Sequence, residues 1–523
     1  MRTAPRALAL AAGVALLAGL AACTGTSSSP AASGGTFVQA LQGDPGDLNP
    51  LKATDPNTWA ALSVAYESLV SVSEDGKFSP FLAKSWKATG TEITYTLKPD
   101  ITCSDGTPFT AETAAANINY NADPANATFY YSSHVTEAVH ATGSGDKLTI
   151  TSTTNNPFLL ADTGTILLVC QDVLDHPTSY SAKTDGTGLF ALGKVDPQTS
   201  YTFDKRKKYD WGPHGVTAST AGLPDKIQLR VITDESTAVN LLLSGELNSA
   251  TVLGPDRARL ESAKLKSAEQ RYPIGEIQFN EKSDRPTADP DVRRALMLAL
   301  DRTQVADVVS DGTATPAISL VNQPPFLCVS KKPDWTLPDQ NLKQAASMLD
   351  KAGWVAGSDG KRSKDGKPLT IKFIYNGGTD SQAAAAELIQ QTWSKIGVDT
   401  ELSANDSTKW TEQLYQTFDW DTGFIVFLPG SPVVLSTFLG KTVPEGGLNF
   451  DFIDNPQYTD YAKQARAAGD AAESCALWNK AEAALVDRTD VYPLTDQFQR
   501  TYMKNATFEM PGYIVPTSVR MEG

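Results

Sequence analysis

The stretch that decides the fold is TYTLKPDITCSDGTPFTA, residues 94–111. Glu92 to Lys98 alternates polar and apolar side chains with a period of two, which predicts a β-strand. Asp105-Gly106 is typical of a tight turn, and Thr110 is a residue type that caps helix N-termini. We therefore predict a strand, a turn and then a helix that begins at Ala111, with Phe109 packed behind the cap.

The same kinds of signal continue along the chain, where strands alternate with helices. Strands are predicted at residues 226–232, 369–375 and 398–402. Asp234 and Asp289 each cap a predicted helix, and further helices are predicted from Leu342 to a stop at Gly353, over 380–395 and over 455–488, the last broken near Gly469. This β-α-β order implies an α/β fold with a partly parallel sheet covered by helices.

Length and charge limit the classes of function. A chain of 523 residues suits two or three lobes. Removal of the two arginines in residues 1–22 takes the formal charge from −15 to −17. Such a surface repels phosphate backbones, so the sequence predicts no nucleic-acid partner.

The N-terminus has the pattern of a secretion signal. Arg2 and Arg6 precede an apolar run that ends in small residues, which predicts a signal peptide over residues 1–22. Leu20-Ala21-Ala22-Cys23 resembles the bacterial lipobox, so we expect Cys23 to be lipidated and residues 23–35 to form a flexible tether. The alternative is a plain secretory signal with an incidental cysteine. The expected location is extracytoplasmic, on the outer face of the cell membrane.

Motifs for catalysis and for cofactors are few. Gly188 to Lys194 has the spacing of a phosphate-binding loop, but Val195 stands where a hydroxyl residue is needed. The sequence contains no GxSxG nucleophile motif and no HExxH pair. It contains no CxxC and only four histidines. We therefore expect a protein that is not an enzyme and has no cofactor and no metal site.

A family resemblance rests on residues 94–111 together with other stretches in the same order. These are Leu48-Asn49-Pro50, residues 65–69, 82–86 and 186–190, and the helix start at 291–296. Together they resemble the family 5 extracellular solute-binding proteins, the peptide- and nickel-type receptors of ABC importers. The resemblance spans nearly all of residues 36–510.

The resemblance implies a two-lobe, periplasmic-binding-protein-like clamp with an extra subdomain in the first lobe. The first lobe is expected at 36–280, with 80–185 as the added subdomain, and the second lobe at 281–484. Residues 485–523 are expected to return to the first lobe.

Four cysteines remain after Cys23, and an even number outside the cell favours disulfides. Three pairings are open. Cys103–Cys170 with Cys328–Cys475 is favoured, since each pair then lies within one expected lobe.

The resemblance also implies a ligand-binding segment at 421–432. In peptide-binding relatives, an aspartate a few residues before the proline holds the amino terminus of the peptide. Here Leu428 stands at that position, and Asp419 or Asp421 could substitute for it if the alignment slips. The candidate ligand-binding residues are Asn49, Tyr130, Tyr131, Asn280, Trp410, Trp420, Phe427, Leu428 and Asp496. The alternative for the aromatic residues is core packing, and for the polar ones a surface or turn role.

The expected function is capture of a solute, an oligopeptide first of all, and its delivery to the permease of an ABC importer by a monomeric lipoprotein. The alternatives are an oligosaccharide or another neutral or capped ligand, a secreted hydrolase, and a receptor of the same fold that signals without transport.

Overall fold

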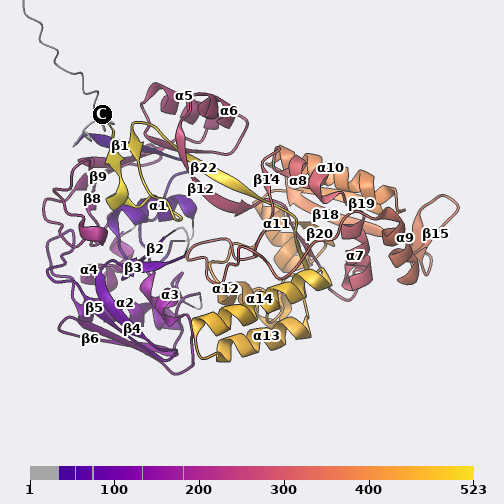
Figure 1. Ribbon diagram of the computed structural model, residues 1–523, viewed down its shortest axis with the longest axis horizontal. Coiled ribbons are helices and arrows are strands. Elements are labelled where there is room, and N and C mark those ends of the chain that lie inside the picture. The colour runs from indigo at the N-terminus through magenta and orange to yellow at the C-terminus, as the bar shows by residue number, and fades with distance from the viewer. Residues whose placement is uncertain (1–33, 54, 74–75, 132, 181, 523) are drawn as a thin grey trace, which may run out of the picture.

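The structure is a computed structural model that describes residues 34–53, 55–73, 76–131, 133–180 and 182–522. The predicted signal peptide, Cys23 and most of the predicted tether lie outside the described residues. The described chain forms two α/β lobes that lie side by side in Figure 1, with the N-terminal half of the sequence mostly in one lobe and residues 276–493 mostly in the other.

The first lobe is built on an eight-stranded mixed sheet. Its strand order is β12-β22-β11-β1-β10-β9-β8, and β14 pairs with β22. β1 is parallel to β10 and β11, whereas β9 and β22 run antiparallel to their neighbours. The strands are β1 (Thr36–Leu41), β8 (Phe190–Asp196), β9 (Ser200–Lys205), β10 (Lys226–Val231), β11 (Ser249–Val252), β12 (Lys266–Pro273), β14 (Ala314–Thr315) and β22 (Asp496–Met503). Helices α1 (Pro56–Ala65), α5 (Glu235–Ser244) and α6 (Arg257–Ser262) belong to the same lobe.

A four-stranded antiparallel sheet forms the lower part of this lobe in Figure 1. Its order is β4 (Ala83–Ala88), β5 (Glu92–Leu97), β7 (Lys147–Ser152) and β6 (Val139–Ser144). The helices α2 (Ala111–Ala122), α3 (Leu159–Gly164) and α4 (Gln171–Asp175) accompany it. This unit shares one hydrophobic core with the large sheet, because residues such as Ile93 and Ile118 cluster with Phe37 and Phe203. We propose it as the added subdomain.

The opening stretch folds as its pattern predicts. β5 ends at Leu97, and α2 begins at Ala111 after the N-cap Thr110, whose hydroxyl oxygen accepts a hydrogen bond from the Thr113 amide at 3.2 Å. Phe109 is buried. Gly143 on β6 lets the start of the helix approach the sheet, since a Cβ at this position would lie 2.2 Å from the backbone of Ala111.

The second lobe contains a five-stranded sheet of order β19-β18-β20-β13-β21. β18 is parallel to β19 and β20, which confirms the prediction of a partly parallel sheet. The strands are β13 (Glu276–Phe279), β18 (Thr370–Asn376), β19 (Asp399–Asn405), β20 (Thr422–Phe424) and β21 (Val491–Pro493). The helices are α7 (Pro290–Leu298), α8 (Arg302–Val309), α9 (Leu342–Lys351), α10 (Asp380–Ser394), α11 (Ser407–Glu412), α12 (Pro432–Thr437), α13 (Pro456–Ala467) and α14 (Ala471–Arg488).

Two strand connections cross between the lobes side by side, in addition to the short excursion of residues 314–315, which pair as β14 with β22 of the first-lobe sheet. The chain passes from β12 to β13 through Ile274 and Gly275, and it returns from β21 to β22 through Leu494 and Thr495. The backbone amides of Ile274 and Gly275 both face the carbonyl oxygen of Thr495, at 3.4 and 3.1 Å. At two adjacent crossings of this kind, small backbone rotations can change the angle between the lobes.

The crossings lie six residues before the boundary expected at 280/281 and ten residues after the one expected at 484/485. β13 already pairs in the sheet of the second lobe, and α14 and β21 still belong to that lobe. Only two residues separate the strands at each crossing, so no long connecting segment marks the crossing in the sequence. We propose the lobe boundaries at 274/275 and 494/495.

Both favoured disulfides are present, Cys103–Cys170 and Cys328–Cys475. The segment that has the spacing of a phosphate-binding loop forms part of strand β8, so it is not a helix-capping loop. None of the helices in the described residues has the length and hydropathy needed to cross a bilayer.

A solute cavity between the two lobes

A cavity of about 530 Å³ lies where the two lobes meet, a size usual for small-molecule sites. The first lobe contributes α1, β2 (Val70–Val72), α3, residues 129–130 and 133–134, and the C-terminal loop at 511–517. The second lobe contributes the loop at 323–327 and residues 428–434, which lead into and begin α12. A ligand in this cavity therefore contacts both lobes at once.

The second-lobe wall is fixed by pairing between its two loops. The amides of Asn322 and Gln323 donate to the carbonyl oxygen of Pro429, and the Leu327 amide donates to that of Gly430. Gly430 permits this close approach, because a Cβ there would lie 2.4 Å from the carbonyl oxygen of Pro324. A Cβ at Gly512 in the first lobe would lie 2.7 Å from Cγ of Pro324, so the lobes touch at this wall.

One side of the cavity is an aromatic wall made of Trp59, Phe129 and Tyr130. The ring centroids lie 5.1 Å apart for Trp59 and Phe129, 5.8 Å for Trp59 and Tyr130, and 5.6 Å for Phe129 and Tyr130. Phe129 is 40% exposed although it is large and apolar. Such a surface binds flat or apolar groups by stacking and by burial of area.

The lining contains two acids, Glu67 and Asp162, one histidine, and no lysine or arginine among the described residues. Burial raises the pKa of Glu67 to about 7, opposed by hydrogen bonds from Tyr209, Thr187 and Trp211. Burial lowers the pKa of His134 to about 4, so its ring is neutral at pH 7. The lining therefore carries no positive charge at neutral pH.

Two of the nine candidate ligand-binding residues lie at this cavity. Tyr130 is part of the aromatic wall, and its hydroxyl accepts a hydrogen bond from the Leu167 amide. Leu428 projects from the second lobe and is 50% exposed. That these two residues bind the solute stays a prediction.

The polar candidates Asn49, Asn280 and Asp496 are buried, lie outside the cavity lining, and are used by the fold. Asn49 donates to the carbonyl oxygen of Pro177, and Asn280 donates to those of Phe418 and Trp420. Asp496 pairs with Arg271 at 2.9 Å. Their polar atoms satisfy backbone or charged groups inside the protein.

The aromatic candidates Tyr131, Trp410, Trp420 and Phe427 also lie outside the lining. Trp420 and Phe427 are buried in a hydrophobic cluster of the second lobe, and Trp410 packs against that cluster. The Tyr131 hydroxyl donates to Glu137 at 2.6 Å. Trp420, Phe427 and Trp410 thus pack in or against the hydrophobic core, which is the alternative role given for the aromatic candidates.

The substitute acids Asp419 and Asp421 are likewise used inside the second lobe. The Asp419 carboxylate pairs with Lys372 at 2.7 Å and with Arg285 at 3.1 Å. Asp421 is buried, and its carboxylate accepts a hydrogen bond from the Lys372 amide at 2.7 Å. Neither residue lines the cavity, so Leu428 has no acidic neighbour there from this segment.

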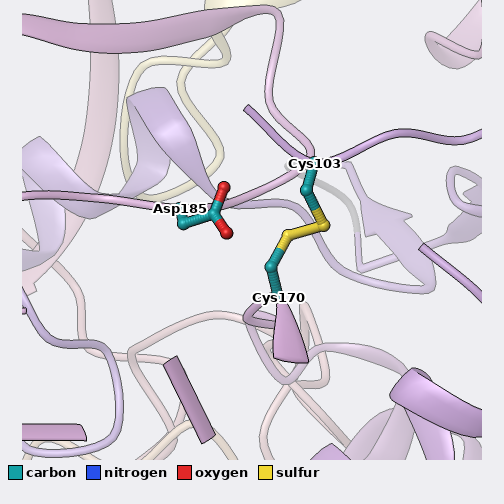
Figure 2. Close-up of side chains that lie close together, drawn as sticks. All are labelled: Cys103, Cys170 and Asp185. Carbon is teal, nitrogen blue, oxygen red and sulfur yellow. A yellow bond between two sulfur atoms is a disulfide. The ribbon is translucent and has the colours of Figure 1, made fainter. Parts of the chain in front are cut away.

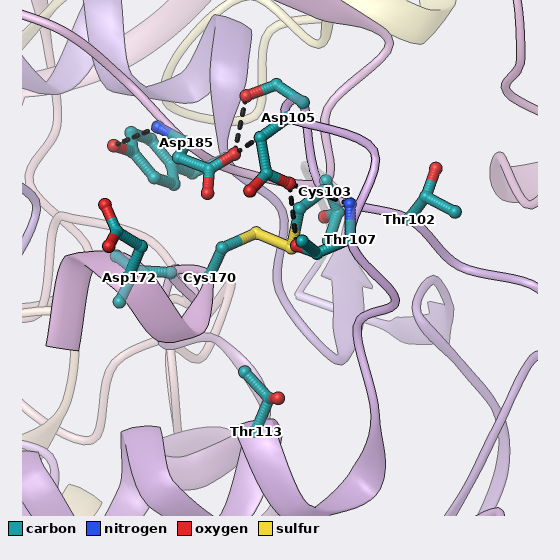
Figure 3. Close-up of a disulfide and its surroundings, with 12 residues drawn as sticks. Thr102, Cys103, Asp105, Thr107, Thr113, Cys170, Asp172 and Asp185 are labelled. Atoms are coloured by element: carbon teal, nitrogen blue, oxygen red, sulfur yellow. Dashed lines mark hydrogen bonds between the residues drawn. A yellow bond between two sulfur atoms is a disulfide. The ribbon is translucent and has the colours of Figure 1, made fainter. Parts of the chain in front are cut away.

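One grouping among the described residues has the composition of a metal site, namely Cys103, Cys170 and Asp185 (Figure 2). The two sulfur atoms are bonded to each other, so neither is a thiolate. Figure 3 shows that Asp185 faces the turn at Asp105, whose backbone amide donates to the Asp185 carboxylate at 3.3 Å. The Ser104 hydroxyl also donates to this carboxylate, at 2.7 Å. The grouping is a cross-linked junction that holds the β5–α2 turn against α4.

Asp162, Trp59 and the C-terminal loop at 511–517 also line the cavity, and none of them is among the residues predicted from the sequence. Asp162 is the only charged residue in the apolar run from Pro157 to Cys170, and this isolation could have marked it as a candidate. The residues at 511–517 belong to no motif. Only the return of the chain to the first lobe brings them to the cavity.

The fold and this cavity define a two-lobe solute-binding protein. Residues 77–442 match the family described as bacterial extracellular solute-binding proteins, family 5, and the chain belongs to that family.

Relatives of known structure and name agree with this class. The chain is 26% identical to the glutathione-binding protein GsiB of Shigella dysenteriae over 491 residues, which cover 88% of this chain and 89% of that protein. The ABC transporter substrate-binding protein CtaP of Listeria monocytogenes superimposes with a TM-score of 0.78, at 19% identity and with 94% and 100% of the two chains covered. The oligopeptide-binding protein AppA of Bacillus subtilis, solved in complex with a nonapeptide, gives a TM-score of 0.72, at 20% identity with 94% and 100% covered.

Proposed function

We propose that the protein is an extracytoplasmic lipoprotein that captures an oligopeptide between its lobes and delivers it to the permease of an ABC importer. The observation that carries this proposal is the cavity at the lobe junction, which is lined from both sides of the hinge. A ligand that contacts both lobes favours the closed arrangement by its differential affinity for that state. The protein acts as a monomer, with no chemical change to the solute.

The residues of the cavity support binding without catalysis. Ser133 and His134 lie 3.0 Å apart between Oγ and Nδ1, which is within reach of a nucleophile and a base. However, the Ser133 hydroxyl donates to the carbonyl oxygen of Phe129 at 2.8 Å, and the lowered pKa of His134 makes it a weak base. No carboxylate among the described residues is hydrogen-bonded to His134 to orient it.

The glutathione that the relatives' name specifies is a poor match for this cavity. Glutathione carries two carboxylates, one more than a peptide with neutral side chains, and the described lining offers them no lysine, no arginine and a neutral histidine. An uncompensated anion in a cavity of low polarity is unfavourable. We therefore propose a solute other than glutathione.

A neutral or capped ligand, such as an oligosaccharide, is the alternative that one observation favours. Leu428 lies in the cavity where peptide-binding relatives are expected to have an acid. The aromatic wall could stack on a sugar as well as on a peptide side chain.

A thermal-shift screen of the mature chain against short peptides, oligosaccharides and glutathione tests the proposal. A peptide at 100 times its Kd should stabilise the protein by about 2.7 kcal/mol. Stabilisation by a peptide that is recovered intact supports the proposal. Stabilisation by sugars alone, or turnover of any peptide, would overturn it.

The proposed anchor has its own test. Cells treated with globomycin, which blocks the lipoprotein signal peptidase, should accumulate the uncut precursor, and Cys23→Ser should release the protein from the membrane. Unchanged processing in both cases would contradict lipidation at Cys23.

A further inference from the structure

The two acids of the cavity differ in their hydrogen-bond partners. Both oxygens of Glu67 are occupied: Oε1 accepts from the Tyr209 hydroxyl at 2.6 Å, and Oε2 accepts from Thr187 at 2.9 Å and from the Trp211 indole at 3.1 Å. Glu67 therefore links the segment after α1 to Thr187 and to the segment 209–211 within the first lobe. Its carboxylate is not available to a solute.

Among the described residues, the Asp162 carboxylate has a single side-chain hydrogen-bond partner. Its Oδ2 accepts a hydrogen bond from the Asn156 amide at 2.8 Å. No lysine, arginine or histidine in the described part of the chain pairs with it. Burial raises the pKa of Asp162 to about 7, since the ionised form lacks water and a counterion.

Asp162 lies at the junction of the lobes. It is on the short helix α3, whose Phe158 and Ala161 pack into a cluster of the second lobe with Leu327 and Leu435. Asp162 itself lines the cavity, as do Leu327 and the aromatic wall. A group held by Asp162 is therefore also within the space that the second lobe closes.

Charge complementarity identifies the chemical class of the solute. A half-buried carboxylate without a counterion, in a lining that has no cation, favours a positively charged group. The aromatic wall of Trp59, Phe129 and Tyr130 favours a solute in which this positively charged group is attached to an apolar or aromatic body.

We propose that Asp162 is the anchor for a protonated amine of the solute, whose apolar part lies against the aromatic wall. The proposal rests on the proposed function, in that the solute enters this cavity, and it narrows the solute to cationic amines. The anchor is in the first lobe, whereas the position at which peptide-binding relatives are expected to have an acid is Leu428 in the second.

Isothermal titration calorimetry on the full mature chain tests this, with two matched pairs of probes. One pair is phenethylamine and its N-acetyl form. The other is the tripeptide amide Ala-Phe-Ala with a free amino terminus and its N-acetyl form. Each pair differs in the positive charge, so the preference for the amine in the wild type tests the anchor without any variant.

The variant Asp162→Asn removes the charge and keeps the size and the oxygen that accepts from Asn156. Its thermal midpoint at pH 7.5 should be no lower than that of the wild type, because a half-buried charge without a counterion is removed. Binding of the amines should weaken by about 10- to 100-fold, as expected for the loss of a charge-assisted hydrogen bond, and binding of the N-acetyl forms should change by less than about twofold. The matched control is Asp146→Asn, since Asp146 is an exposed acid of the same subdomain that pairs with Lys84. This control variant should bind both the amines and the N-acetyl forms as the wild type does.

Equal affinity of the wild type for amine and N-acetyl forms would overturn the anchor, as would an equal loss of both in Asp162→Asn, or no binding of either amine at millimolar concentration. If the tripeptides bind without a preference for the charge, the peptide proposal stands and the anchor fails. If phenethylamine binds through Asp162 and no peptide binds, the anchor stands and the peptide proposal fails.

Discussion

Burial changes the acid–base behaviour of individual carboxyl groups in this protein, and Glu276 shows the effect most simply. Glu276 begins β13 and is buried, with Oε1 accepting from the Gln278 amide group at 2.7 Å and from the Phe427 amide at 3.2 Å. Burial raises the pKa of Glu276 from 4.5 to about 8, although these hydrogen bonds oppose the shift. Between pH 4.5 and about pH 8, Glu276 keeps its proton in the folded protein, whereas it has released this proton in the unfolded chain. The stability from this group is therefore full below about pH 4.5 and is lost as the pH rises towards 8.

We predict that Glu276→Gln reduces the pH dependence of stability. The amide keeps the accepting oxygen and cannot ionise, so the variant avoids a loss of roughly 1.4 kcal/mol per pH unit across this window. Urea denaturation at pH 5 and pH 8 measures the free energy of unfolding. Relative to the wild type, the variant should be more stable at pH 8 than at pH 5. Glu401→Gln on the exposed face of β19 is the control and should follow the wild type. A variant that loses as much stability as the wild type between the two pH values would contradict the raised pKa.

The roles of single residues could be predicted from sequence only where they are local. Thr110, Asp234 and Asp289 cap their helices as predicted, because a cap depends on the next three residues. Asn280 and Trp420 could not be placed this way, since an asparagine amide or an indole is suited equally to a ligand and to the interior. Their packing depends on segments about 140 residues apart, such as the hydrogen bond from Asn280 to the Trp420 carbonyl.

Side-chain contacts between residues far apart in the sequence join the elements of the second lobe, and Arg293 on α7 makes several of them. Its guanidinium is buried and donates to Asp490 at 2.8 Å, to the Thr489 carbonyl at 2.8 Å and to the Thr287 carbonyl at 2.9 Å. It thereby ties α7 to the end of α14. Arg488 also pairs with Asp490, at 2.6 Å, so the network is shared.

We predict that Arg293→Met destabilises the protein by about 3–5 kcal/mol, because buried acids and carbonyl oxygens lose their partner. The neighbouring Arg294→Met is the matched control. Arg294 is exposed, and its one hydrogen bond to the described residues goes to the Asp487 carbonyl at 3.0 Å, so its replacement should cost less than about 0.5 kcal/mol. Chemical denaturation of both variants measures the difference. An equal decrease in the free energy of unfolding for the two variants would contradict a special contribution of the buried Arg293 network to stability.

The Cys103–Cys170 disulfide joins the turn after β5 to the start of α4, across 67 residues of sequence. Replacing both cysteines with alanine should lower the free energy of unfolding by about 2–5 kcal/mol, because the unfolded chain becomes less constrained. Urea denaturation of the double variant gives the value. Non-reducing peptide mapping of the wild type should recover both cross-linked peptide pairs, and free thiols at Cys103 and Cys170 would contradict the assignment.

At the scale of the whole molecule, the two lobes are connected at the paired crossings around Gly275 and Thr495. A Cβ at Gly275 would lie 2.8 Å from Cγ2 of Thr495, so the crossing strands are closely packed. The cavity lies between the lobes that these strands connect. Rotation about the crossings would open or close it.

The fold class could be predicted from sequence because its evidence is spread along the chain. The hairpin-to-helix unit at 94–111 and the collinear stretches each add to the same conclusion, and the disulfide pairing followed from the expected lobes. The cavity could not be predicted, since its wall combines residues near 60, 130, 162, 325, 430 and 513. These positions meet only after the lobes have packed.

Small-angle X-ray scattering of the mature chain during titration with the tightest solute from the screen tests the central claim directly. A solute held between two hinged lobes should reduce the radius of gyration in a saturable way, with half of the change at the Kd found by calorimetry. Scattering curves that stay superimposable when the protein is saturated with that solute would contradict capture by closure of the lobes.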